Sequence, residues 1–258
     1  MRLLHRKNDE EFSIAEFSGK NIPPYAILSH TWGADNEEVT FRDVVEGSGS
    51  SKAGYQKIRF CGEQAARDDL RYFWVDTCCI DKSSSAELAE AINSMFRWYK
   101  DSDKCYAYLS DVSVSDGEPS RLAWESAFQK SRWFTRAWTL QELIAPKSIE
   151  FFSAEGRRLG DKKSLQQKIG DITGVSLQAL QGTPLFHFSI DERMSWAAKR
   201  EAKREEDEAY SLLGVFDVQM PLLYGEKKAK AFIRLQEEID KSLKSKLFSS
   251  ISISPLVA

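Results

Sequence analysis

The feature that most constrains the fold is an alternation of short apolar runs and longer amphipathic stretches between residues 25 and 152. The short runs are rich in aromatic and β-branched residues, which favour buried strands. Strands that alternate with helices of about 10 to 20 residues indicate a parallel sheet with helices on both faces. We therefore expect an α/β fold with strands at Tyr25–Ser29, Tyr72–Asp76, Cys105–Leu109 and Ile149–Phe152.

The C-terminal part of the chain has a different pattern. It shows helical spacing at Lys162–Thr173, Ser176–Gln181 and about Ala229–Leu243, with a highly charged stretch at Asp191–Leu213. This pattern predicts a helical C-terminal subdomain packed on the sheet. We expect one domain at residues 1–244, with an α/β core at about 1–155 and the helical subdomain at 156–244. Residues 245–258 would form a tail or the start of a linker.

The composition argues against several classes of function. The net charge is −3 over 258 residues, which is not the basic footprint of a nucleic-acid-binding protein. The chain lacks a run of about 18 apolar residues that would predict a membrane span, and its N-terminus lacks an apolar signal region. We therefore expect a cytoplasmic protein. The four cysteines match no zinc-binding spacing, so we expect free thiols.

Polar clusters follow three of the predicted strands. The first strand ends in the cluster Ser29–Gly33, and the second ends in the cluster Asp76–Asp81. Ser110 follows the third strand. The carboxyl ends of parallel strands meet at one edge of a sheet, where ligands bind in folds of this class. We therefore expect a shared pocket. Its candidate binding residues are Ser29, His30, Trp32, Gly33, Asp76, Thr77, Cys78, Asp81 and Ser110.

The stretch Ser131–Leu143 is the densest in candidate functional residues. It holds two tryptophans, two arginines and Glu142, without glycine or proline, and predicts one helix that ends before Pro146. Helical spacing places Trp138 and Glu142 near one face. A carboxylate beside an indole can bind a sugar hydroxyl or stabilise a cation. The alternative is a packing helix in which Glu142 pairs with Arg136 or Arg132.

Three segments resemble the three blocks of the fungal heterokaryon-incompatibility (HET) domain: Tyr25–Gly33, Trp74–Asp81 and Arg132–Leu143. Three later segments are similar to its C-terminal signature: Arg193–Ala197, Asp207–Gly214 and Met220–Glu226. The resemblance covers about residues 1–240. It implies a cell-death effector of fungal non-self recognition, a form of innate immunity. Such domains often precede a NACHT-type receptor module. The sequence given has no P-loop and so does not include that module, which we expect in the same or another chain.

A second resemblance concerns mechanism. Trp138–Leu143 is similar to the tryptophan-x-x-x-glutamate-leucine segment of Toll/interleukin-1 receptor (TIR) domains. In enzymatic TIR domains this glutamate carries NAD⁺ cleavage. The resemblance thus implies Glu142 as the catalytic residue, NAD⁺ as the substrate without a further cofactor or metal, and a TIR-like or flavodoxin-like sheet. It also implies self-association, because TIR-like enzymes complete their site between protomers. The loop Ser29–Gly33 lacks the TIR arginine, and Asp76–Asp81 has no clear TIR counterpart, which leaves the substrate open.

An NAD⁺ glycohydrolase needs little machinery. Nicotinamide leaves as a neutral group, and a carboxylate near the ribose can stabilise the cation that develops on the sugar. Trp32 or Trp138 would stack on a ring of the substrate, since an indole face attracts the positive nicotinamide. Arg136 completes the expected set of substrate-binding residues.

Three alternatives remain open at the level of sequence. Asp76, Asp81 and Glu142 form a candidate Mg²⁺ site for phosphoester cleavage. Cys78 with His30 as its base would make a nucleophilic hydrolase. Finally, the domain would act without enzymatic activity if it signals only by self-assembly, in which case the three blocks are structural.

Overall fold

The computed structural model describes residues 1–7, 11–19, 21–114 and 121–251. Its centre is a seven-stranded sheet with the strand order β2-β1-β4-β3-β5-β6-β7. The strands are β1 (Arg2–Arg6), β2 (Phe12–Glu16), β3 (Tyr25–His30), β4 (Tyr72–Trp74), β5 (Lys104–Tyr108), β6 (Ile149–Phe152) and β7 (Arg158–Asp161).

The middle of the sheet is the parallel core that the sequence predicts. The strand β3 pairs in parallel with β4 on one side and β5 on the other, and β5 pairs in parallel with β6. All six residues of β3 are buried, as expected for a parallel strand covered on both faces. The predicted α/β class is therefore confirmed.

The edges of the sheet are antiparallel and were not predicted. On one side β1 pairs antiparallel with β4 and with β2, and its Leu3 and Leu4 are fully buried. On the other side β7 pairs antiparallel with β6. The sheet thus extends past residue 155, where the sequence placed the end of the α/β core.

Helices join the parallel strands. The main helices of this half are α1 (Phe41–Glu46), α2 (Tyr55–Arg67), α3 (Ser85–Asp101), α4 (Arg121–Lys130) and α5 (Thr139–Ile144). The helix α2 packs against β3, β4 and β5. Because β3→β4 and β4→β5 cross the sheet in opposite directions, right-handed connections place α2 and α3 on opposite faces. The Ser84 hydroxyl accepts a hydrogen bond from the Glu87 N–H and so caps α3.

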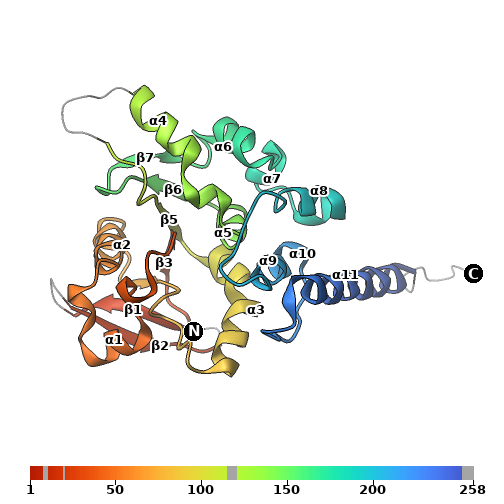
Figure 1. Ribbon diagram of the computed structural model, residues 1–258, viewed down its shortest axis with the longest axis horizontal. Coiled ribbons are helices and arrows are strands. Elements are labelled where there is room, and N and C mark those ends of the chain that lie inside the picture. Colours follow the sequence, from red (N-terminus) through yellow and green to blue (C-terminus); the bar gives the residue numbers. More distant parts are fainter. Residues whose placement is uncertain (8–10, 20, 115–120, 252–258) are drawn as a thin grey trace, which may run out of the picture.

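The C-terminal part is helical, as predicted. It contains α6 (Gln166–Thr173), α7 (Leu177–Leu180), α8 (Ile190–Ser195), α9 (Asp207–Tyr210), α10 (Leu213–Phe216) and α11 (Lys227–Ile251). The helix α11 is longer than predicted and projects from the body (Figure 1). Short 3₁₀ helices lie at Asp35–Glu37, Gly49–Ser51, Arg132–Thr135 and Leu185–His187. Among the residues placed by the structure, none of the helices combines the length and apolar character that crossing a membrane requires.

Candidate functional site

The strand order creates a switch point beyond the carboxyl ends of β3 and β5. Numbered along the chain, the four parallel strands run 2-1-3-4, the start of the flavodoxin-like order. The connections leave β3 and β5 toward opposite faces, so a crevice opens between the segments that follow these two strands. Ser29 and His30 end β3, Asp76 follows β4, and Ser110 follows β5. The structure therefore brings the predicted clusters to one edge, where the Thr31 and Ser110 hydroxyl oxygens lie 3.5 Å apart.

Asp76 is the hub of the first half of the site. One of its oxygens, Oδ1, lies 2.8 Å from His30 Nε2, and the other accepts a hydrogen bond from Trp32 Nε1 at 2.8 Å. The Lys82 Nζ lies 3.9 Å from Asp76 Oδ2 and 3.7 Å from the centre of the Trp32 ring. Burial would raise the pKa of Asp76, but Lys82 and His30 outweigh burial and hold it well below its usual range. Asp76 is therefore a carboxylate at neutral pH.

Glu142 is the centre of the second half. Its Oε2 accepts a hydrogen bond from the Ser29 hydroxyl at 2.5 Å, and the same hydroxyl oxygen accepts one from Trp133 Nε1 at 2.8 Å. The side chain is buried, with Glu142 only 6% exposed. Burial raises the pKa of Glu142 to about 8; the Ser29 hydrogen bond and Arg200 act in the opposite direction, while Asp76 adds to the rise. At pH 7 Glu142 is therefore mainly a neutral acid.

The positive charge that lowers the pKa of Glu142 belongs to Arg200. Its Nη1 donates to Thr139 Oγ1 at 2.8 Å and to the Arg136 carbonyl at 2.9 Å. Burial lowers the pKa of Arg200 to about 10, and the neighbouring Glu142 opposes that change. In the alternative expected from the sequence, a packing helix pairs Glu142 with Arg136 or Arg132; α5 is indeed buried, but the described partner of the Glu142 carboxyl is Ser29 rather than either arginine.

The stretch Ser131–Leu143 is not the single helix that the sequence predicts. It forms a 3₁₀ helix at Arg132–Thr135 and the helix α5, and the backbone between them is extended at Arg136. The reason is a backbone pairing with a distant segment, because Ala137 N donates to the Glu201 carbonyl at 2.9 Å and Glu201 N donates to the Thr135 carbonyl at 2.7 Å. These groups are thus unavailable for helical hydrogen bonds. Trp138 and Glu142 remain one turn apart, with 3.5 Å between the Trp138 carbonyl and the Glu142 N–H.

A cavity of about 360 Å³ opens beside this network, in the range of about 300–1,000 Å³ typical of small-molecule sites. Three of its lining side chains are cationic, namely Arg132, Arg136 and Lys203, and the Lys203 ammonium is paired with Asp35. Trp32 also lines the cavity and is 39% exposed. Glu142 is not part of the lining in this conformation. The full lining is Thr31, Trp32, Gly33, Ala34, Asp35, Arg132, Arg136 and Lys203.

A buried ion pair supports the loop that carries Trp32. The Lys57 ammonium lies 2.6 Å from Glu38 Oε1 and donates to the Thr31 carbonyl at 3.2 Å. The same Glu38 oxygen accepts a hydrogen bond from Gly33 N at 2.6 Å. Sequence analysis missed Lys57 and Glu38, as it missed Lys82, Trp133 and Arg200. Trp133 lies within the Arg132–Leu143 block but was given no role there, and no local motif marks the other four.

Several predicted binding residues lie away from the cavity. Thr77 and Cys78 are buried, and burial raises the pKa of the Cys78 thiol well above its usual value. Asp81 accepts hydrogen bonds from the backbone and the hydroxyl of Ser83, in the turn before α3. Trp138 is half-buried and is not in the cavity lining.

These placements weigh against two of the alternatives. The Cys78 nucleophile lacks support because its thiol is buried and stays protonated. The Mg²⁺ alternative needs Asp76, Asp81 and Glu142 together. Within the described ranges, the structure contains no group of three or more His, Cys, Asp or Glu side chains arranged to hold a metal ion.

Comparisons with known proteins point to the same family as the resemblance, and the family match includes the first two of the three segments. Residues 25–123 match the profile of a family described as "Heterokaryon incompatibility protein (HET)". The chain is also 60% identical over 247 residues to the "Vegetative incompatibility protein HET-E-1" of Podospora anserina. That match covers 93% of this chain but 18% of the relative, so the chain spans about a fifth of the length of this curated relative. No solved structure matches the fold.

Proposed function

This chain belongs to the heterokaryon-incompatibility (HET) family, and from that premise we propose that it is a cell-death effector domain of fungal non-self recognition that cleaves the nicotinamide–ribose bond of NAD⁺. Glu142 is the catalytic residue of this proposal. The observation that carries it is the position of Glu142, a buried carboxyl with a pKa raised to about 8 at the switch point of a parallel sheet. Strongly perturbed carboxyls in such places are typical of functional sites.

The cavity lined by Trp32, Arg132 and Arg136 supports a dinucleotide as the substrate. Arg132, Arg136 and Lys203 place positive charge where a diphosphate would bind, and guanidinium groups bind phosphate with two hydrogen bonds. The exposed indole of Trp32 offers a surface for stacking on a ring of the substrate. Asp76 holds that indole by its Nε1 and so fixes the orientation of the ring.

The reaction proceeds by loss of nicotinamide. The bond between C1′ of the ribose and the nicotinamide nitrogen breaks, and its electron pair neutralises the positive charge of the ring. The ionised form of Glu142 stabilises the ribosyl cation that remains, as carboxylates do in glycosidases. Water then attacks C1′ and releases a proton, which gives ADP-ribose and nicotinamide.

The conformation seen here is the resting form in this proposal. The Ser29 hydroxyl donates a hydrogen bond to Glu142 Oε2. The segment that holds Arg200 and Lys203 lies near Glu142 through Arg200 and lines the cavity through Lys203. Self-association then shifts this segment and opens Glu142 to the cavity. A NACHT-type receptor module in the same or another chain would supply the trigger in the cytoplasm; the relative, of which this chain corresponds to 18%, has room for one.

A non-enzymatic role in death signalling by self-assembly is the second candidate. The observation that favours it is the burial of Glu142, which is only 6% exposed and separate from the cavity lining. In this case the Ser29–Glu142–Trp133 network is structural and fixes the strand ends for assembly.

One experiment separates the two candidates. The purified chain is incubated with NAD⁺ over a wide range of protein concentrations, and the products are resolved by chromatography. The enzymatic proposal predicts nicotinamide and ADP-ribose, with turnover per protein that rises with concentration. If the protein assembles at high concentration and NAD⁺ stays intact, the enzymatic proposal is wrong and assembly alone accounts for the function.

A further inference from the structure

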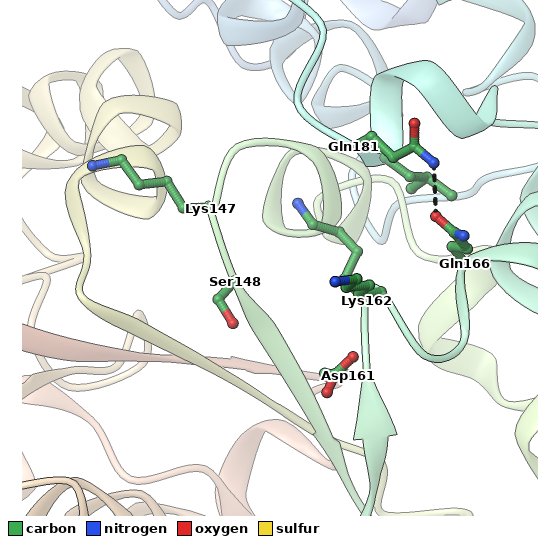
Figure 2. Close-up of a pocket in the computed structure, with 8 residues that line it drawn as sticks. Lys147, Ser148, Asp161, Lys162, Gln166 and Gln181 are labelled. Atoms are coloured by element: carbon green, nitrogen blue, oxygen red, sulfur yellow. Dashed lines mark hydrogen bonds between the residues drawn. The ribbon is translucent and has the colours of Figure 1, made fainter.

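A second and larger cavity, of about 560 Å³, lies at the opposite end of the sheet from the candidate site. One wall is the connection that leads into β6, with Lys147 and Ser148. The other wall comes from the residues that end β7 and begin α6, together with Leu180 and Gln181 at the end of α7. Figure 2 shows Ser148 across from Lys162, Gln166 and Gln181, with Lys147 on the same wall as Ser148 and its side chain extended away from Lys162.

Lys162 is the side chain that gives this cavity its chemistry. It is buried, and its ammonium donates to the carbonyls of Pro146 at 2.6 Å and Leu143 at 3.3 Å. An ammonium has three N–H donors, so one remains for a ligand. Among the residues that the structure describes, no carboxylate lies within ion-pair distance of this ammonium, and burial lowers the pKa of Lys162 to about 8. A buried cation without an anion is costly, and an anion bound in the cavity would offset that cost.

The mouth of the cavity is also positive. Lys147 and Lys163 are exposed lining residues, and neither forms an ion pair within the described part of the chain. The only acidic lining residue is Asp161, and its two oxygens are already engaged, one by Arg158 Nη2 at 2.7 Å and the other by Ser164 N at 2.7 Å. A ligand would therefore meet three lysines and one carboxylate, both oxygens of which already accept hydrogen bonds.

Neutral donors and acceptors complete the lining. Gln181 Nε2 donates to Gln166 Oε1 at 3.0 Å, which fixes the two amides against each other. The Gln166 amide nitrogen and the Gln181 amide oxygen then remain for a ligand, as does the hydroxyl of the exposed Ser148. The lysines would bind the anionic group of a ligand, and the amides and the hydroxyl would bind the uncharged polar part of the same molecule.

We propose that this cavity binds a small, soluble, phosphate-bearing molecule, with the phosphate against Lys162 and between Lys147 and Lys163. The phosphate accepts a hydrogen bond from the remaining Lys162 N–H, and the amides and the Ser148 hydroxyl bind the polar body of the ligand. A soluble ligand fits better than a membrane headgroup because the Lys162 ammonium is buried rather than exposed on a surface. The proposal is independent of NAD⁺ cleavage, since the cavity lies at the other edge of the sheet.

The test is calorimetric titration of the whole chain with inorganic pyrophosphate. The double variant Lys147→Ala/Lys163→Ala should bind about tenfold or more weakly, because each lysine supplies a charge-assisted hydrogen bond. Ser148→Phe, which narrows the mouth without a change of charge, should also weaken binding. The matched control Lys230→Ala/Lys244→Ala removes two exposed lysines of α11 and should bind like the unmodified chain.

The variants change exposed side chains, and an unchanged melting temperature confirms that each is folded. Absence of pyrophosphate binding by the unmodified chain would overturn the proposal, as would equal weakening in the control, which would indicate non-specific charge. Binding to phosphatidic-acid vesicles without binding to pyrophosphate would also overturn it, in favour of a membrane surface.

Discussion

Asp76 and Glu142 are two carboxyls of one strand-end network, yet the structure gives them opposite protonation states. Asp76 has Lys82 and His30 as partners, so its pKa lies well below the usual range even though burial acts in the other direction. Glu142 is bonded by the neutral hydroxyl of Ser29, and burial raises its pKa to about 8. At Asp76 the directly contacting Lys82 and His30 outweigh burial, whereas at Glu142 burial outweighs both the Ser29 hydrogen bond and Arg200. In enzymes, two carboxyls whose pKa values differ in this way take the separate roles of acid and base.

The largest effect is expected from Glu142→Gln. If Glu142 stabilises the ribosyl cation, this change should lower the rate of NAD⁺ cleavage by roughly 10²–10³, or about 3–4 kcal/mol of transition-state stabilisation. The variant should stay folded, with a near-normal melting temperature at about pH 4.5, because the amide has the size of the neutral acid, and it should gain stability relative to the unmodified protein as pH rises toward 8. Glu237→Gln, an exposed change on α11, is the matched control and should keep full activity. A Glu142→Gln protein that is folded and fully active would remove Glu142 from the mechanism.

Asp76→Asn should have the opposite profile, with its main effect on stability. The change leaves Lys82 and His30 without their anion, and the free energy of unfolding should fall by about 2–3 kcal/mol. The loss is smaller than for a fully buried pair because the Asp76 side chain keeps 17% exposure. Urea unfolding at pH 7 measures the difference. If Asp76→Asn and Glu142→Gln are equally stable, the contrast between the two carboxyls is wrong.

The pH dependence of stability should also separate them. Glu142 holds its proton in the folded state up to about pH 8, whereas the unfolded side chain loses it near 4.5. The folded state therefore binds more protons in this window, and its stability relative to Glu142→Gln should fall as pH rises from about 4.5 to 8, by up to about 1.4 kcal/mol per pH unit. Asp76 acts oppositely: its contribution is present above pH 3.8 and is lost as pH falls further. Unfolding curves of both proteins across this range test the sign.

The smallest effect is expected from Ser29→Ala. The variant removes the hydroxyl that donates to Glu142 and accepts from Trp133 Nε1, so stability should fall by about 1 kcal/mol. The pKa of Glu142 should rise further, because the Ser29 hydrogen bond lowers it in the intact protein. Ser48→Ala, which removes an exposed hydroxyl from the loop after α1, is a control that should change neither quantity. A lower Glu142 pKa in Ser29→Ala would show that the hydroxyl does not stabilise the carboxylate.

The sequence was sufficient for the centre of the sheet and insufficient for its edges. Runs such as Tyr25–Ser29 consist of residues that favour strands, and burial on both faces makes them continuous. The strand β1, which joins the edge strand β2 to β4, mixes Leu3 and Leu4 with basic residues, and a short run of this kind has no distinct period. The helix predicted across Arg136 failed because its backbone pairs with Glu201, a contact that local spacing cannot show.

The strand-end residues of the candidate site could be predicted from the sequence, whereas the groups that act on their pKa values could not. Ser29, His30 and Asp76 could be found because they end or follow strands whose carboxyl ends must meet. The ionisation of Asp76 and the burial that keeps Glu142 neutral could not be predicted, because they depend on where Lys82 and the packed C-terminal segment lie. The opposite states of Asp76 and Glu142 are therefore a result of the tertiary structure alone.

The central contrast is tested most directly by NMR titration of the side-chain carboxyl carbons of Asp76 and Glu142, assigned with Asp76→Asn and Glu142→Gln. The structure predicts that Glu142 titrates at about 8 and that Asp76 stays ionised down to well below its ordinary pKa of 3.8. Two carboxyls that both titrate near 4, the range of exposed Asp and Glu side chains, would contradict the account of this site.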